Sequence, residues 1–181
     1  MILGITGSFG AGKGAVVDFL RTRGFTHFAA RTFLLEEIER RHLPVNRDSM
    51  ASVANDLRAR YGPTYVVAEL LKRAEASGMD AVIESLRTVA EVQFIQEEGG
   101  IVLGIDAPPE IRFARVIKRA SETDHVTFQE WVEQEKKEMN PDEPTKQDIF
   151  GALNLSDTRI KNDGTIEELH WKLDQFLTSF S

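Results

Sequence analysis

The sequence predicts an α/β fold in which a parallel sheet of about five strands lies between two layers of helices. The chain opens on an apolar run, residues 1–6, that stops at a glycine-rich loop and continues as a helical pattern. Further short apolar runs follow, and apolar residues at helical spacing occupy segments between them. The later runs span residues 25–30, 81–86, 101–107 and 158–161, and the helical segments include 15–20, 34–74, 113–120 and 166–180. Runs that stay apolar along their length are typical of strands buried on both faces of a parallel sheet.

Composition limits the classes of protein that this chain can represent. At 181 residues the chain is long enough for a well-buried core, and we expect residues 1–181 to form one domain. Acidic residues outnumber basic ones by 29 to 22, so attraction of the whole chain to nucleic acid or to an anionic membrane is not expected. An anionic ligand must then be met by arginines placed locally.

Compartment and covalent chemistry follow from what the sequence lacks. Without cysteine there are no disulfides, no thiol catalysis and no cysteine zinc sites. We find neither an apolar run near the ~20 residues that span a bilayer nor a signal-peptide pattern. These features predict a cytoplasmic protein without a membrane partner.

The glycine-rich loop at residues 7–13 matches the pattern G-x-x-x-x-G-K of phosphate-binding loops. The glycines let the backbone turn through positive φ and approach phosphate oxygens, while the lysine supplies a mobile positive charge. A helix that starts at the loop adds the positive end of its dipole. A plain glycine turn with a surface lysine is the alternative. We expect the nucleotide to be held by Gly7, Ser8, Phe9, Gly10, Ala11, Gly12, Lys13, Gly14 and Ala15.

The loop departs from the common pattern at Gly14, where most such loops carry the Ser or Thr whose hydroxyl holds Mg²⁺. The same Lys-Gly pair occurs in the adenylate-kinase branch, whose loop reads G-x-G-K-G-T, and here Ala15 replaces that threonine. We therefore expect Mg²⁺ to be held through water and phosphate oxygens.

Three helical patterns between the second and third strands predict a helical insertion at about residues 31–76. Small-molecule kinases place the part that closes over the phosphate acceptor at this position, so the resemblance described below implies this role here. Arg31 follows the second strand, at the sheet edge where ligands collect. Arg58 lies inside the insertion. Both are candidate substrate-binding residues, and solvated surface arginines are the alternative interpretation.

Glu84 interrupts the third strand close to its end, and Arg87 follows three residues later. A carboxylate there is costly to bury unless it is paired or lies near a metal. We expect Glu84 to hold Mg²⁺ through water and Arg87 to contact phosphate. The alternative is a structural ion pair between Glu84 and Arg87.

The helix after the fourth strand carries Arg112, Arg115 and Arg119 three and four residues apart, on one face. With the loop that follows, this helix suits a short lid at about residues 112–127. Arg115 and Arg119 are catalytic candidates, because the kinases that the chain resembles, described below, carry lid arginines on such a helix. A basic face exposed to solvent is the alternative. The stretch 127–130 predicts a capping box that opens the next helix.

Three stretches carry a resemblance to a known family: the loop with Lys-Gly, the stretch 82–88 (VIESLRT) and the distal stretch 162–169 (NDGTIEEL). Together they resemble the P-loop nucleotide kinases, in particular the adenylate-kinase-like and dephospho-coenzyme-A-kinase-like group. The resemblance implies a three-layer P-loop NTPase fold, a parallel sheet of about five strands with helices on both faces. It also implies ATP and Mg²⁺ as cofactors. Carried over by position, Lys13 would bind the β and γ phosphates, Glu84 would organise metal-bound water, and Arg87 would contact the transferred or acceptor phosphate. Asn162 and Gly164 would lie beside the adenine.

Two departures bear on the substrate. Adenylate kinases place one more residue between the acid and the arginine than this chain does at Glu84 and Arg87. Dephospho-coenzyme-A kinases carry an aspartate just after the second strand as the base for a ribose hydroxyl, and here residues 28–31 read FAAR. The missing aspartate favours an acceptor that is already a phosphate or that needs no strong base.

We therefore expect an ATP-dependent phosphotransferase that acts on a small phosphorylated acceptor, a nucleotide in the manner of nucleoside monophosphate kinases. Dephospho-coenzyme A is an alternative acceptor, and a nucleotide-binding regulatory ATPase is an alternative of another class. The partner is a small molecule and not a nucleic-acid polymer. The acceptor, the base preference and the oligomeric state stay open at this point.

Overall fold

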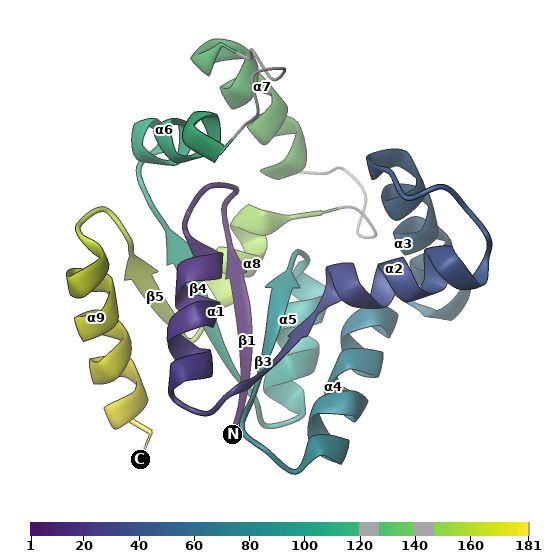
Figure 1. Ribbon diagram of the computed structural model, residues 1–181, viewed down its shortest axis with the longest axis horizontal. Helices are drawn as coiled ribbons and strands as arrows, with labels where there is room; N and C mark the ends of the chain where they lie inside the picture. Colours follow the sequence, from purple (N-terminus) through teal and green to yellow (C-terminus); the bar gives the residue numbers. More distant parts are fainter. Residues whose placement is uncertain (120–126, 140–146, 181) are drawn as a thin grey trace.

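A parallel five-stranded sheet forms the centre of the molecule (Figure 1). The computed structural model describes residues 1–119, 127–139 and 147–180. The strands lie in the order β2-β3-β1-β4-β5, and every neighbouring pair is parallel. They are β1 (Ile2–Gly7), β2 (Thr26–Ala29), β3 (Ala81–Leu86), β4 (Ile101–Asp106) and β5 (Thr158–Lys161). The predicted fold class is confirmed.

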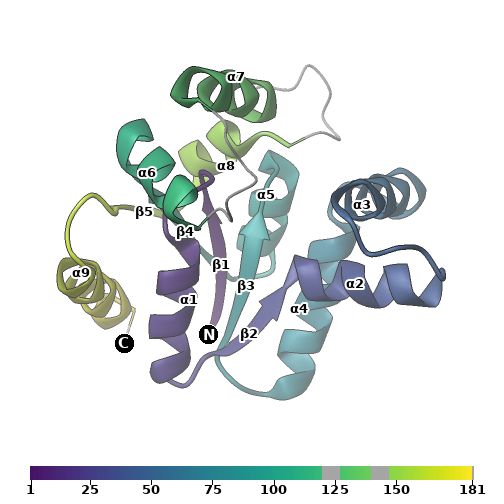
Figure 2. The same cartoon turned by 45° about the horizontal axis from the view of Figure 1, so that its top comes forward.

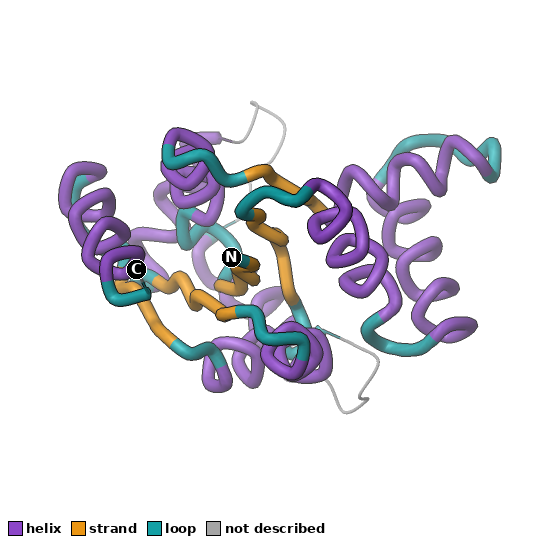
Figure 3. Tube along the Cα trace, turned by 90° about the horizontal axis from the view of Figure 1, so that it is seen from below, coloured by secondary structure: helices purple, strands orange, loops and turns teal. Residues whose placement is uncertain are grey.

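Helices cover both faces of the sheet, as the view from below shows (Figure 3). One face packs against α1 (Lys13–Thr22) and α9 (Ile166–Thr178), whose apolar stripes meet Leu3, Ile5, Val82 and Leu103. The other face packs against α4 (Tyr65–Ser77), α5 (Val89–Glu97) and α8 (Ile149–Leu155). Because both faces are buried, the strands read as the continuous apolar runs seen in the sequence. Helices α5 and α8 were not among the predicted helical segments.

Two helices, α2 (Ala30–Arg40) and α3 (Arg47–Tyr61), project beyond the β2 edge of the sheet (Figure 1). They are fixed by Phe33, Ile38, Val53 and Leu57, which join the core of the α4 and α5 face. The second strand ends one residue earlier than predicted, because Ala30 already starts α2.

Above the carboxyl ends of the strands lie α6 (Pro109–Arg119) and α7 (Phe128–Met139), here called the α6–α7 arm (Figure 2). Phe113 packs against Phe128 and Trp131, with ring centroids 5.3 and 5.8 Å apart. The predicted capping box is present: Glu130 accepts a hydrogen bond from the backbone N–H of Thr127, and Thr127 Oγ1 accepts one from the N–H of Glu130. Residues 120–126 of the predicted lid lie outside the described residues.

Strand β3 contains an irregularity near its carboxyl end, where its pairing register with β1 shifts. In the pairing with β1, Ile5 lies opposite Glu84, but Thr6 lies opposite Leu86, so Ser85 is an extra residue in the strand. The bulge resets the alternation of side chains, and Leu86 therefore enters the same core as Ile83, three residues earlier. In the part of the chain that the structure describes, no helix combines the length and apolar character needed to cross a membrane.

Candidate functional site

The loop between β1 and α1 has a backbone that its glycines make possible. Gly10 has φ 81° and Gly12 has φ 98°, in the region that other residues rarely adopt. Space is also restricted: a Cβ at Gly12 would lie 2.3 Å from Nδ2 of Asn162, and one at Gly10 would lie 2.7 Å from the backbone oxygen of Arg112. The predicted positive φ angles are therefore present, and the loop packs closely against Asn162 and Arg112.

Lys13 folds back over this loop from the first turn of α1. Its Nζ donates hydrogen bonds to the backbone oxygens of Gly7 at 2.7 Å and Ser8 at 3.1 Å. The ammonium group is thus held over the concave side of the loop, at the N-terminal end of the α1 dipole. This is the position from which a lysine can contact bound phosphate.

Side chains from two other segments hold the outer carbonyls of the loop. Arg115 on α6 donates through Nη1 to the backbone oxygen of Ala11 at 3.4 Å, and Asn162, directly after β5, donates to the same oxygen at 2.8 Å. Arg112 on α6 donates through Nη1 to the backbone oxygen of Phe9 at 3.3 Å. With these oxygens held from outside, the loop keeps a fixed shape whose first-turn N–H groups are available to an anion.

Ser8 and Asp106 form a further link between the loop and β4. The Ser8 side chain is 1% exposed, and its Oγ donates to Oδ1 of Asp106 at 3.0 Å. Asp106 ends β4, next to the loop strand β1. A carboxylate is therefore present beside the loop on the side opposite β3.

Glu84 is paired with a residue that the sequence analysis did not select. Oε2 of Glu84 lies 3.0 Å from Nε2 of His27, and both side chains are partly buried. Ala29 pairs with Glu84 across β2 and β3, and His27, two residues earlier, shares its face. The hydrogen bond from His27 holds the pKa of the Glu84 carboxyl below its usual range, and the charges of Lys13 and Arg87 act in the same direction.

Arg87 is exposed directly after β3 and does not form the ion pair with Glu84 that we considered as an alternative. Its Nη1 donates to Oε1 of Gln147 at 2.9 Å, and its backbone N–H donates to Oε2 of Glu91 at 2.7 Å. The backbone is thereby fixed while the guanidinium stays at the surface. Because Glu84 pairs with His27 instead, the two predicted site residues have separate partners.

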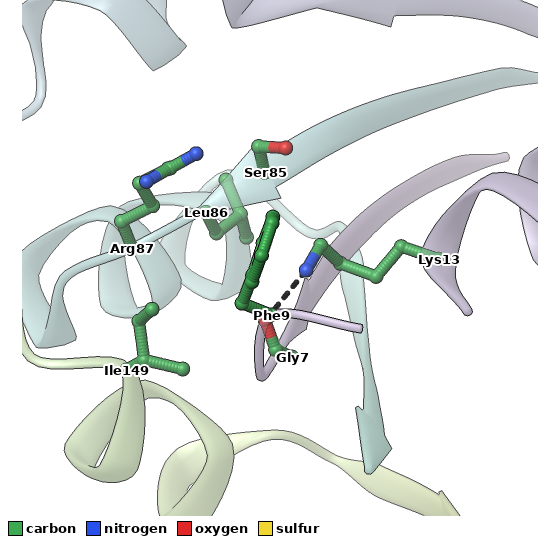
Figure 4. Close-up of a pocket in the computed structure, with 7 residues that line it drawn as sticks. All are labelled: Gly7, Phe9, Lys13, Ser85, Leu86, Arg87 and Ile149. Carbon is green, nitrogen blue, oxygen red and sulfur yellow. Dashed lines mark hydrogen bonds between the residues drawn. The ribbon is translucent and has the colours of Figure 1, made fainter. Parts of the chain in front are cut away.

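A small hollow of about 40 Å³, open to solvent, lies at this edge of the sheet; we call it the β3-edge pocket. Figure 4 shows Lys13 on one side of it and Arg87 on the other, with the Phe9 ring between them. The Ser85 backbone has φ 76°, an unusual value for a residue with a side chain. The pocket is lined by Gly7, Phe9, Lys13, Ser85, Leu86, Arg87 and Ile149.

Arg58 lies in a buried polar contact and not on the surface. Its Nη2 lies 3.4 Å from Oε1 of Glu91, whose side chain is 2% exposed. Among the described residues, Nε of Arg58 is buried without a hydrogen-bond partner. Since Glu91 also accepts from the Arg87 backbone, one carboxylate connects α3 to the turn after β3.

The other predicted site residues have diverse surroundings. Arg31 is exposed in the first turn of α2, with Nη1 at 3.7 Å from Sδ of Met50. Arg119 ends α6, and its side chain lies outside what the structure describes. Asn162 is buried against the loop, and Gly164 lies next to Glu168, whose carboxylate a Cβ at that glycine would meet. Of the three arginines expected to share one face of α6, Arg112 is buried, so neither a solvated face nor a lid face describes it.

The residues present fit a nucleotide phosphate chain. The glycine loop, the α1 N-terminus and Lys13 provide a concave, positively charged cradle. A Cβ at Gly14 would meet nothing within 4 Å, so the absent Ser or Thr leaves space instead of a replacement ligand. No cluster of three metal-binding side chains occurs among the described residues. Mg²⁺ would therefore depend on phosphate oxygens and water, with Glu84 and Asp106 as nearby carboxylates.

Sequence reasoning missed four residues of this site: His27, Ser85, Glu91 and Asp106. Asp106 ends an apolar run in the same way that Glu84 does, and residues 88–91 match the capping pattern [S/T]-x-x-E, so both had a signal. The proximity of His27 to Glu84 depends on the register of β2 and β3, which the sequence did not indicate. Ser85 could be identified only from the bulge in the pairing of β3 with β1.

Comparison with known structures places the fold among the P-loop kinases. A dephospho-CoA kinase from Campylobacter jejuni superposes with a TM-score of 0.61 at 14% identity, covering 99% of this chain and 96% of that one. A shikimate kinase from Bacteroides thetaiotaomicron gives a TM-score of 0.58 at 16% identity, with 98% of each chain covered. At this level of identity the likeness concerns the fold, and it does not single out the adenylate-kinase-like group.

Comparison with known sequences gives the family. A UPF0200 protein of Pyrococcus horikoshii is 30% identical over 192 aligned residues, which cover 98% of this chain and 96% of that protein. The chain therefore belongs to the UPF0200 family. No protein-family model matches the chain.

Proposed function

We propose that this chain is an ATP-dependent phosphotransferase whose acceptor is a small phosphorylated molecule, a nucleotide as in nucleoside monophosphate kinases. One observation carries the proposal: Lys13 belongs to the phosphate loop and also lines the β3-edge pocket. A donor phosphate on the loop and an acceptor in the pocket would thus meet at the same ammonium group. The kinase fold of the solved structures agrees with this arrangement.

In this proposal the chain acts by alignment and charge neutralisation, as phosphoryl transfer requires. Loop residues 7–15 and Lys13 hold the donor phosphates, and Arg87 holds the acceptor phosphate. Arg115 and Arg119 approach the oxygens that gain charge, and Asn162 and Gly164 lie on the adenine side. Mg²⁺, when bound, neutralises the phosphate oxygens, and Glu84 orders the water around it.

The same proposal gives roles to the parts around the sheet. Residues 31–76 form the acceptor-binding insertion, and residues 112–127 form the lid, within one domain of residues 1–181. Arg31 and Arg58 belong to the acceptor side.

A hydroxyl acceptor such as dephospho-coenzyme A is the second candidate, because His27 on β2 and Glu84 on β3 form a hydrogen-bonded pair. A histidine oriented by a carboxylate can accept a proton from a hydroxyl group. The pair supplies the base that the sequence, read only at residues 28–31, lacked.

The experiment is a coupled assay of ADP release over nucleoside monophosphates, deoxynucleotides and dephospho-coenzyme A. Lys13→Ala should lower turnover with the preferred acceptor by roughly 10²- to 10³-fold, as expected for one lost donor to the transition state. Lys72→Ala is the matched control, because Lys72 is an exposed lysine on α4 that pairs with Glu69.

Melting temperatures of both variants separate a loss of catalysis from a loss of fold. Near-normal transfer by a folded Lys13→Ala protein would reject the kinase proposal. Transfer only to dephospho-coenzyme A, abolished by His27→Ala, would favour the second candidate over the first.

A further inference from the structure

Phe9 is an exposed aromatic residue inside a phosphate-binding loop. Its side chain is 58% exposed, although the loop is otherwise built from small residues at positions 7–12. Single exposed apolar residues are common on protein surfaces and need no explanation by themselves. This ring, however, lies in the wall of the β3-edge pocket, between Lys13 and Arg87 (Figure 4).

The structure holds the Phe9 backbone in place. Its carbonyl oxygen accepts the hydrogen bond from Nη1 of Arg112, and the next residue is the glycine with φ 81°. Arg112 is itself fixed by an ion pair with Glu135 and by stacking of its guanidinium on Trp131, 5.0 Å from the ring centroid. The position of the Phe9 backbone is thus fixed, so a ligand that binds the ring has to order only its side-chain torsions.

The lining of the pocket has an apolar part and a positively charged part. Phe9, Leu86 and Ile149 supply an apolar wall, whereas Lys13 and Arg87 supply positive charge. Ligand sites commonly combine a mainly apolar lining with a few polar groups that fix orientation. A ligand that satisfies both parts of this pocket has a flat apolar face and an anionic group.

We propose that Phe9 is a specificity-determining residue: the acceptor carries a planar ring that stacks on the Phe9 side chain and an anionic group that Arg87 binds. This inference rests on the proposed function, and it restricts the acceptor class to ring-bearing phosphates such as nucleoside monophosphates. Open-chain phosphates and sugar phosphates without a ring of this kind are excluded as good acceptors.

The test compares AMP with ribose 5-phosphate, a probe that has the same sugar and phosphate but lacks the planar adenine ring. Their dissociation constants are measured by calorimetry with the full chain saturated with Mg²⁺ and a non-hydrolysable ATP analogue, so that AMP cannot occupy the donor site. The wild type should bind AMP at least about fivefold more tightly than ribose 5-phosphate, since stacking of a base on an aromatic side chain contributes about 1–3 kcal/mol.

Phe9→Ala should weaken AMP by roughly 5- to 100-fold and leave ribose 5-phosphate within about twofold. Phe9→Leu retains apolar area without the ring and should give an intermediate value. Phe150→Ala is the matched control, because Phe150 on α8 is 59% exposed and does not line the pocket; both affinities should stay unchanged. Arg87→Gln should weaken both probes alike.

Equal affinity of the two probes in the wild type, an equal effect of Phe9→Ala on both, or no binding of either probe would overturn the inference. Failure of the proposed function shows differently, as absence of binding of the ATP analogue. In that event the two probes are compared without the analogue, and the same affinity ratio decides whether Phe9 recognises a ring.

Discussion

Arg87 at the β3 edge and Arg112 in the α6–α7 arm both lie near the glycine loop, but they differ in their surroundings. The comparison shows that the role of an arginine depends on whether its side chain is buried or exposed. Arg112 is 4% exposed: Nε donates to the backbone oxygen of Ala107 at 2.8 Å, and both terminal nitrogens donate to Glu135. Arg87 is exposed, and its side chain bonds to Gln147. The buried guanidinium holds protein parts together, whereas the exposed one can exchange its partner for a ligand.

The comparison teaches that a basic helical face in a sequence is not evidence of phosphate contacts. Arg112 and Arg115 are three residues apart on α6, yet one is buried under Trp131 and the other reaches the loop carbonyl of Ala11. The decisive partners, Glu135 and Trp131, belong to α7 and are about 20 residues away in sequence. Helical spacing gives the face of a residue but not the element that covers it.

The largest effect is expected from Arg112→Ala. This change leaves Glu135, which is 12% exposed, without its partner, and removing one member of a buried ion pair costs about 3–5 kcal/mol. Urea unfolding of the variant should show this loss. Arg87→Ala, by contrast, should change the free energy of unfolding by less than about 0.5 kcal/mol, as is usual for surface substitutions.

The double variant Arg112→Met with Glu135→Met provides the control for this comparison. Removing both charges avoids the uncompensated carboxylate, so the double variant should be more stable than Arg112→Ala. If Arg112→Ala and Arg87→Ala destabilised the protein equally, the division between a structural arginine and a ligand arginine would be wrong.

A smaller effect, mainly on activity, is expected from Glu84→Gln at the sheet edge. The amide keeps the size of the side chain and removes its charge, so turnover should fall by roughly 10- to 100-fold and the Mg²⁺ requirement should rise. Stability at neutral pH should change little, because the pair with His27 is only partly buried. Mg²⁺-dependent turnover and melting temperature, measured on the same preparation, check both expectations.

The pH dependence of stability gives an independent reading of the Glu84 carboxylate. Its pKa is lowered in the folded protein, so its contribution to stability is present above the ordinary value of 4.5 and is lost as pH falls through the folded pKa. Glu84→Gln should remove this part of the acid destabilisation. A variant with the acid profile of the wild type, and with unchanged Mg²⁺ dependence, would remove Glu84 from the candidate site.

The sequence predicted the parts of the fold that depend on local patterns. The loop at residues 7–13, the apolar strands and the capping box of α7 at Thr127 and Glu130 all appear where the patterns indicate. It did not predict the partner of Glu84, because His27 reaches Glu84 through the pairing of strands that are more than 50 residues apart in the chain. The pocket was out of reach for the same reason: Ile149 comes from α8, an element that was not predicted.

The smallest effect is expected at Ser85, where the sheet edge and the α6–α7 arm differ in backbone strain. Ser85 has φ 76°, and a left-handed conformation costs a residue with a Cβ roughly 1 kcal/mol relative to glycine. Ser85→Ala retains this conformation and removes the hydroxyl, whereas Ser85→Gly removes both the hydroxyl and the strain. The glycine variant should therefore be more stable than the alanine variant by up to about 1 kcal/mol, reduced by the greater entropy of glycine in the unfolded chain.

If the hydroxyl contacts the acceptor in the β3-edge pocket, both variants should show the same rise in acceptor KM, because both lack it. Unfolding curves of equal midpoint for the two variants would show that the relief of strain only balances the entropy cost of glycine, and a higher midpoint for the alanine variant would contradict the prediction. A rise in KM in the glycine variant alone would show that the bulge conformation, and not the hydroxyl, shapes the pocket.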